Sequence, residues 1–141
     1  MHNHDPVRVL YIEDNCDSFD MLEVLLGMSG IGVDSASSID QALKRAQVES
    51  FDLYLLDSGL PDGSGLNLCR TLRTVDPEIP VLFYSGHALP EEIKMAMAAG
   101  ADGYIIKPHS EKLAETITQL VANRRARPAV LASLPVFAAA A

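Results

Sequence analysis

Five apolar segments rich in β-branched and aromatic residues alternate along the chain with five segments whose apolar residues recur at helical spacing. The apolar segments, which we interpret as strands, cover residues 7–12, 31–36, 51–56, 79–84 and 103–106. Strict alternation of strand and helix is typical of a parallel sheet covered by helices on both faces. Because crossovers are right-handed, it predicts a flavodoxin-like, doubly wound α/β fold with strand order 2-1-3-4-5.

Local residues mark where the predicted helices begin and end. Asp17 or Ser18 is expected to cap the first helix, and Pro90 fits the first turn of the fourth. Asp76-Pro77 is expected to end the third helix, since the residue before proline disfavours helical geometry. The 31–36 segment is partly polar, which suits a strand at the edge of the sheet.

Composition excludes several classes of protein. The chain has 141 residues, 48% of them hydrophobic and 21% charged, which indicates one globular domain. A net charge of −8 argues against nucleic-acid binding, which requires clustered cations. A membrane span would need about 20 consecutive apolar residues, and the sequence has no such run. The beginning of the chain lacks a signal-peptide pattern and the two cysteines lie far apart, so we expect a reduced cytoplasmic protein.

Chemically reactive residues follow four of the five predicted strands. These residues are Glu13 and Asp14, Asp57, Ser85, and Lys107. The carboxyl ends of parallel strands meet at one edge of the sheet, so these side chains are expected to gather there. Crowded carboxylates repel unless a cation is near, and an all-oxygen site with waters suits Mg²⁺. The set indicates phosphoryl transfer to Asp57, with the metal and Lys107 offsetting charge and Ser85 donating a hydrogen bond.

These motifs resemble the receiver domain of bacterial two-component response regulators, similar to the single-domain chemotaxis type. The matching segments are Glu13-Asp14-Asn15, Asp57 with Leu60-Pro61-Asp62-Gly63, Ser85-Gly86, Tyr104 and Lys107-Pro108. They occur in the family's order and at its separations. The resemblance covers about residues 6–123, with 1–5 as a flexible N-terminus and 124–141 as an Arg-then-Ala/Pro-rich tail.

The resemblance implies a role for each matching residue at the phosphorylation site. Asp57 is the phosphoacceptor, receiving phosphate from a sensor histidine kinase or a phosphotransfer protein. Asp14, Asp57 and the backbone carbonyl of Gly59 hold Mg²⁺, while Glu13 acts mostly through water. Ser85 and Lys107 contact the phosphoryl group. The family commonly has a cis peptide at the position of Lys107-Pro108.

The resemblance also implies how phosphorylation is read out and how long it lasts. Ser85 moves toward the phosphate and Tyr104 acts as the switch aromatic. The output surface would be the fourth helix, fifth strand and fifth helix, which bind an unknown protein target or a second copy of the chain. Positions 59 and 87 tune phosphate lifetime; because Gly59 has no side chain, we hypothesise that His87 is the main local influence.

Other functions and roles stay open on the sequence alone. A Mg²⁺-dependent phosphohydrolase that works through a phospho-aspartate would use the same residue types, and a flavodoxin-like cofactor binder would share the fold. A receiver without a DNA-binding output domain could also serve as a phosphotransfer intermediate or phosphate sink in a relay. We expect no enzyme beyond its own phosphorylation and dephosphorylation. The apolar tail is expected to be disordered or to dock on the domain or a partner.

Overall fold

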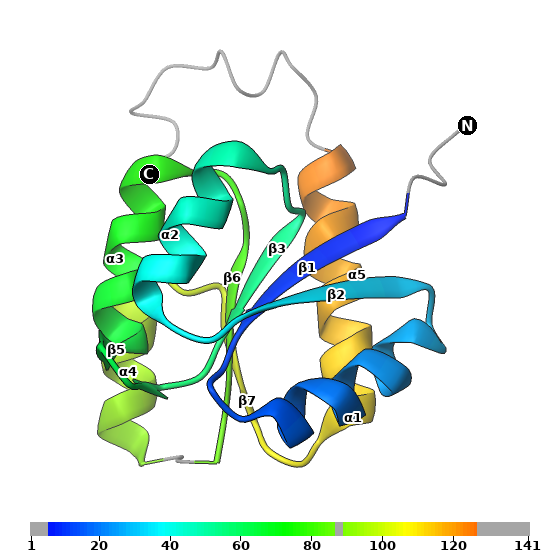
Figure 1. Ribbon diagram of the computed structural model, residues 1–141, viewed down its shortest axis with the longest axis horizontal. Coiled ribbons are helices and arrows are strands. Elements are labelled where there is room, and N and C mark those ends of the chain that lie inside the picture. The colour runs from blue at the N-terminus through cyan, green and yellow to red at the C-terminus, as the bar shows by residue number, and fades with distance from the viewer. Residues whose placement is uncertain (1–5, 87–88, 127–141) are drawn as a thin grey trace.

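The computed structural model describes residues 6–86 and 89–126, which fold into one central sheet flanked by helices (Figure 1). The sheet strands are β1 (Val7–Ile12), β2 (Ile31–Ala36), β3 (Leu53–Leu56), β6 (Val81–Ser85) and β7 (Gly103–Ile106). The helices are α1 (Cys16–Gly27), α2 (Ile39–Val48), α3 (Gly65–Val75), α4 (Pro90–Ala98) and α5 (Ser110–Ala126). All neighbouring strands of this sheet are parallel, in the order β2-β1-β3-β6-β7. The predicted fold class and strand order are confirmed.

Alternate side chains of the central strands point into two separate hydrophobic cores, one on each face of the sheet. In β1, Leu10 and Ile12 face the core beneath α2, α3 and α4, whereas Val9 and Tyr11 face the core beneath α1 and α5. Figure 1 shows these two groups of helices on opposite faces of the sheet. Such two-sided burial explains why the strands read as continuous apolar runs rather than alternating ones. β2 lies at the predicted edge, where Gly32 is exposed.

Side-chain caps fix where the helices begin. Asn15 caps α1 by accepting a hydrogen bond from the Ser18 N–H at 3.1 Å, so our prediction of Asp17 or Ser18 as the cap was wrong. The physical reason is that α1 starts at once after the acidic turn, leaving Asp17 inside its first turn. Pro90 occupies the first turn of α4, as predicted.

A small antiparallel ribbon, which the sequence did not predict, follows β3. Its strands are β4 (Gly59–Leu60) and β5 (Gly63–Ser64), joined through Pro61 and Asp62. The Asp62 carboxylate accepts hydrogen bonds from the backbone N–H groups of Ile39 at 2.9 Å and Asp40 at 3.1 Å. Those bonds lower the pKa of Asp62. The ribbon therefore ties the loop after β3 to the N-terminus of α2.

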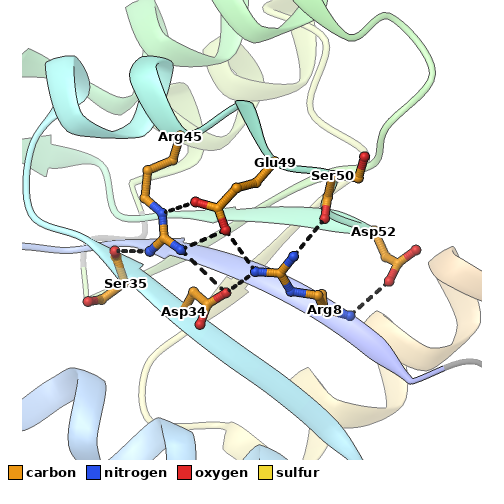
Figure 2. Close-up of polar contacts among 7 residues, drawn as sticks. All are labelled: Arg8, Asp34, Ser35, Arg45, Glu49, Ser50 and Asp52. Carbon is orange, nitrogen blue, oxygen red and sulfur yellow. Dashed lines mark hydrogen bonds and ion pairs between the residues drawn. The ribbon is translucent and has the colours of Figure 1, made fainter. Parts of the chain in front are cut away.

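An ion-pair network closes the opposite end of the sheet, where β1, β2 and α2 meet (Figure 2). The Arg8 guanidinium pairs with Asp34 and, at 3.0 Å, with Glu49. Arg45 pairs with Glu49 at 2.8 Å, and both guanidinium groups lie over the Phe51 ring. Hydrogen bonds from Arg45 and Arg8 lower the pKa of Glu49 to about 2. The network therefore ties β1, β2 and the end of α2 to one another, although they are distant in sequence.

Helix α5 is the longest helix and runs past the predicted end of the domain. It extends to Ala126, so Arg124 and Arg125 belong to the helix and not to the tail that we predicted to begin at residue 124. Arg125 pairs with Asp52 at 3.3 Å and donates to the Pro6 carbonyl at 3.3 Å, which anchors the helix end to the sheet. No helix within residues 6–86 and 89–126 has both the length and the apolar character needed to cross a membrane.

Candidate functional site

The predicted site residues lie at the carboxyl ends of four neighbouring strands. In register, Ile12 of β1 pairs with Leu56 of β3, so Glu13 and Asp57 follow paired positions. The Asp57 N–H donates to the Ile12 carbonyl at 3.2 Å, and the Lys107 N–H donates to the Ser85 carbonyl at 2.9 Å. The sheet therefore continues through these residues, which fixes their backbone before any side-chain contact is made.

Lys107 forms an ion pair with Glu13, which the sequence did not predict. Its ammonium group lies 2.8 Å from Glu13 Oε1 and 3.9 Å from Asp57 Oδ1. The Glu13 side chain is only 5% exposed, and the Tyr11 hydroxyl donates to the same oxygen at 3.2 Å. Lys107 thus compensates the charge of the buried Glu13 carboxylate, and the expected effect of Glu13 on a metal through water stays a prediction. The Lys107-Pro108 peptide bond is cis, as the resemblance implied.

The rings of Tyr11 and Tyr84 pack near this ion pair. The Lys107 ammonium lies 5.6 Å from the centre of the Tyr84 ring, and the Tyr11 and Tyr84 rings lie 6.4 Å apart. Burial, followed by the Glu13 charge, raises the pKa of Tyr11, and burial likewise raises the pKa of Tyr84. Both phenols therefore stay neutral near pH 7. The charge of Asp57 also raises the pKa of Tyr11, whereas that of Lys107 opposes the rise at Tyr84.

The other residues predicted to hold a metal are Asp14, Asp57 and Gly59, the last through its backbone carbonyl. Asp57 has a side chain that is 18% exposed, and Asp14 is exposed. Within the described ranges, no group of three acidic, histidine or cysteine residues is arranged as a metal cluster. Mg²⁺, however, needs only one or two carboxylates because it keeps several of its waters. Two accessible carboxylates and a backbone carbonyl are hard oxygen donors, so this set fits that ion.

Gly65 brings the first turn of α3 against the backbone of Asp57. A methyl group at Gly65 would collide with the Asp57 carbonyl oxygen and would lie 3.1 Å from the Phe83 ring. Gly65 is buried, and its N–H donates to the Ser58 carbonyl at 3.0 Å. The absence of a side chain therefore lets α3 begin directly beside the phosphoacceptor candidate.

A set of hydroxyl groups lies beside Asp57, and sequence reasoning found only part of it. Ser58 Oγ lies 2.7 Å from Ser85 Oγ, and the Tyr104 ring stacks on Phe83 with ring centres 5.5 Å apart. Burial raises the pKa of Tyr104, while hydrogen bonds with Ser85 and Ser58 oppose that rise. Tyr104 is therefore turned toward Ser85. The position of Ser58 directly after Asp57 was the signal that could have identified it.

His87 lies outside the described residues, so the hypothesis that it tunes phosphate lifetime stays a prediction. Gly59 is exposed, and a Cβ built on it would meet no atom within 4 Å. The backbone at position 59 therefore leaves space for a side chain, and glycine is not required there for packing.

Comparison with known proteins decides the family. A sequence model of the response regulator receiver domain matches residues 9–118. The chain belongs to this family. The cell cycle transcriptional regulator CtrA of Caulobacter vibrioides is 32% identical over 116 residues, covering 82% of this chain and 50% of that regulator. The cell cycle response regulator CtrA of Brucella ovis is 33% identical over 116 residues, and this match also covers 82% of this chain and 50% of that regulator. The receiver chain thus spans about half the length of these curated relatives.

Solved structures agree with this assignment. A CheY-like receiver domain protein from Methanospirillum hungatei is 28% identical with a TM-score of 0.80, and the match covers 86% of this chain and 98% of that one. The chemotaxis response regulator CheY4 of Vibrio cholerae is 26% identical with a TM-score of 0.75, over 82% of this chain and 99% of that one. The receiver fold and its two-component class are therefore established.

Proposed function

We propose that this receiver accepts a phosphoryl group on Asp57 from the phosphohistidine of a sensor kinase or phosphotransfer protein. A carboxylate oxygen of Asp57 attacks phosphorus as the phosphorus–nitrogen bond to histidine breaks, and the product is an acyl phosphate. Asp57 is suited to this step because its side chain is partly exposed at the end of β3, where a partner can reach it.

The metal ligands in this proposal are Asp14, Asp57 and the carbonyl of Gly59, with Glu13 nearby. Mg²⁺, when bound by these residues, would supply positive charge that offsets the repulsion between phosphoryl oxygens and carboxylates. Asp14 and Asp57 provide the two accessible carboxylates, whereas Glu13 is already paired with Lys107. We therefore assign Glu13 chiefly to holding Lys107, with any effect on the metal passing through water.

Lys107 and Ser85 are the groups that would contact the transferred phosphoryl group. The Lys107 ammonium lies 3.9 Å from Asp57 Oδ1, close enough to offset charge that develops on the phosphoryl oxygens. Ser85 is fully buried, and its hydroxyl lies 2.7 Å from that of Ser58. Phosphorylation would draw the Ser85 hydroxyl toward the phosphoryl group and break its contacts with Ser58 and Tyr104.

Tyr104 would carry the change from Ser85 to the surface formed by α4, β7 and α5. Met95 of α4 and Ile106 of β7 are 51% and 37% exposed there, and exposed apolar side chains are typical of protein-binding surfaces. An unidentified protein target, or a second copy of the chain, would bind there. The protein would act in the cytoplasm as a switch whose only reactions are its own phosphorylation and dephosphorylation.

The observation that carries the proposal is the approach of the Lys107 ammonium to within 3.9 Å of Asp57 Oδ1 at the carboxyl end of the sheet, where Asp14 follows β1. Incubating the protein with acetyl phosphate and Mg²⁺ should add one phosphoryl group, as measured by intact mass. Asp57→Asn should abolish the adduct, and Asp62→Asn, a control five residues away whose carboxylate faces α2, should keep it. Repeated turnover of acetyl phosphate without a detectable adduct would instead support a phosphohydrolase.

A further inference from the structure

A cavity of about 230 Å³ lies beside Tyr104, between α3, β6, α4 and β7. Its walls are largely apolar and include Leu66, Phe83 and Met95, together with the ring of Tyr104. Ser58 and Glu92 supply polar atoms to the lining. None of the predicted phosphorylation or metal-binding residues other than Tyr104 lines it, so this cavity is distinct from the Asp57 site.

The Glu92 carboxylate gives the cavity its chemical character. Its Oε1 atom is buried and has no hydrogen-bond partner, and Glu92 forms no ion pair within residues 6–86 and 89–126. A buried acceptor without a partner is unfavourable for folding, and more so when it is charged. The position of Glu92 in the first turn of α4 offsets part of this cost through the helix dipole. The dipole does not supply the missing donor.

We propose that this cavity binds a small organic cation, with its cationic head on Glu92 and its apolar body against Phe83, Tyr104 and Met95. A carboxylate acceptor excludes an anionic ligand, because like charges would meet in a site with restricted water. Aromatic faces next to a carboxylate favour a cation further, since cations are attracted to ring faces. The volume admits a compact molecule with one ring or a short alkyl chain, such as an amidinium or primary ammonium compound.

The cation would also meet the negative field of the adjacent phosphorylation site. The charges of Glu92 and Asp57 both raise the pKa of Tyr104, so its hydroxyl lies near negative charge. Only Glu92 of the two lines the cavity, and the Lys107 ammonium, 3.9 Å from Asp57 Oδ1, offsets part of the Asp57 charge. Ser58 adds a hydroxyl that can accept a hydrogen bond from the ligand. Lys94, on the same helix, is exposed and forms no ion pair with Glu92 in the described part of the chain. The cavity therefore has an acceptor without a built-in cation.

Benzamidine is a suitable probe because it is a flat aromatic cation, and neutral benzamide is its matched control. Binding to the unphosphorylated protein would be followed by NMR shifts of the Met95 methyl group and the Tyr104 backbone amide. Benzamidine should shift both signals and bind at least about tenfold more tightly than benzamide, the factor expected of a charge-assisted hydrogen bond. No phosphate donor is present, so failure of this test would leave the proposed function untouched.

Two variants make the test specific to Glu92. Glu92→Gln should remove the preference for benzamidine over benzamide, whereas Glu91→Gln, which changes an exposed neighbour on the same turn, should retain it. No shift with either probe would mean that neither enters the cavity, and equal binding of the two would mean that Glu92 does not select a cation. Either result would overturn the proposal. Retention of the benzamidine preference by Glu92→Gln would overturn it as well.

Discussion

Replacing Lys107 with methionine removes the ammonium group that lies 2.8 Å from Glu13 Oε1 but keeps a side chain of similar length. The change leaves the Glu13 carboxylate, which is 5% exposed, without its cation. The Tyr11 hydroxyl at 3.2 Å and the Asn15 N–H at 3.3 Å still donate to that carboxylate. The variant thus isolates the contribution of the ion pair to folding.

The magnitude follows from how deeply each partner is buried. Breaking a fully buried ion pair costs about 3–5 kcal/mol, whereas an exposed pair contributes about 0–1 kcal/mol. Lys107 is 26% exposed and Glu13 keeps two hydrogen bonds, so this pair falls between the limits. We expect Lys107→Met to lower the free energy of unfolding by about 2 kcal/mol.

Urea unfolding at pH 7 measures this difference, with Lys112→Met as a control on an exposed position of α5. Adding Glu13→Gln to Lys107→Met should cost less than the sum of the two single changes, by about 1–2 kcal/mol. The reasoning is refuted if Lys107→Met costs no more than Lys112→Met. It is also refuted if the two changes at Glu13 and Lys107 are additive.

Two further predictions test other parts of the structure. Gly65→Ala places a methyl group against the Asp57 carbonyl oxygen, so we expect a loss of about 1–3 kcal/mol in urea unfolding, and a wild-type midpoint would contradict the packing of α3 described above. Hydrogen bonds to Arg45 and Arg8 hold the pKa of Glu49 at about 2, below its ordinary value of 4.5. A lowered pKa of an acid stabilises the fold above pH 4.5, and this stabilisation is lost as pH falls toward 2. The difference in unfolding free energy between wild type and Glu49→Gln should therefore shrink between pH 5 and pH 2, and a constant difference would show that the network does not act through the Glu49 charge.

Most of the fold follows from local pattern in the sequence. The apolar runs and helical stripes predict five strands and five helices, and handedness then leaves little choice of strand order. The pattern does not predict the β4–β5 ribbon, because its six residues depend on Asp62 reaching the N-terminus of α2. It also misplaces the cap of α1 and the end of α5. Those boundaries are set by Asn15 and by the contact of Arg125 with Asp52.

The sequence predicts a site residue correctly where its position along a strand alone decides where it lies in the fold. Ser85 ends its strand and Asp57 and Lys107 directly follow theirs, and a parallel sheet brings such positions together. The pairing of Lys107 with Glu13 was not predictable, because it depends on which carboxylate is the more deeply buried. The cavity beside Tyr104 was not predictable either, since its walls come from several separate elements whose side chains meet only in the packed structure.

Chemical mapping of the phosphorylated residue tests the central claim most directly. The protein would be incubated with acetyl phosphate and Mg²⁺, reduced with borohydride, which converts an aspartyl phosphate to homoserine, and sequenced as peptides. We predict homoserine at position 57 alone, and none after omission of acetyl phosphate. Homoserine at position 14, or an unmodified position 57 in protein that carries a phosphoryl group, would contradict the assignment of Asp57 as the phosphoacceptor.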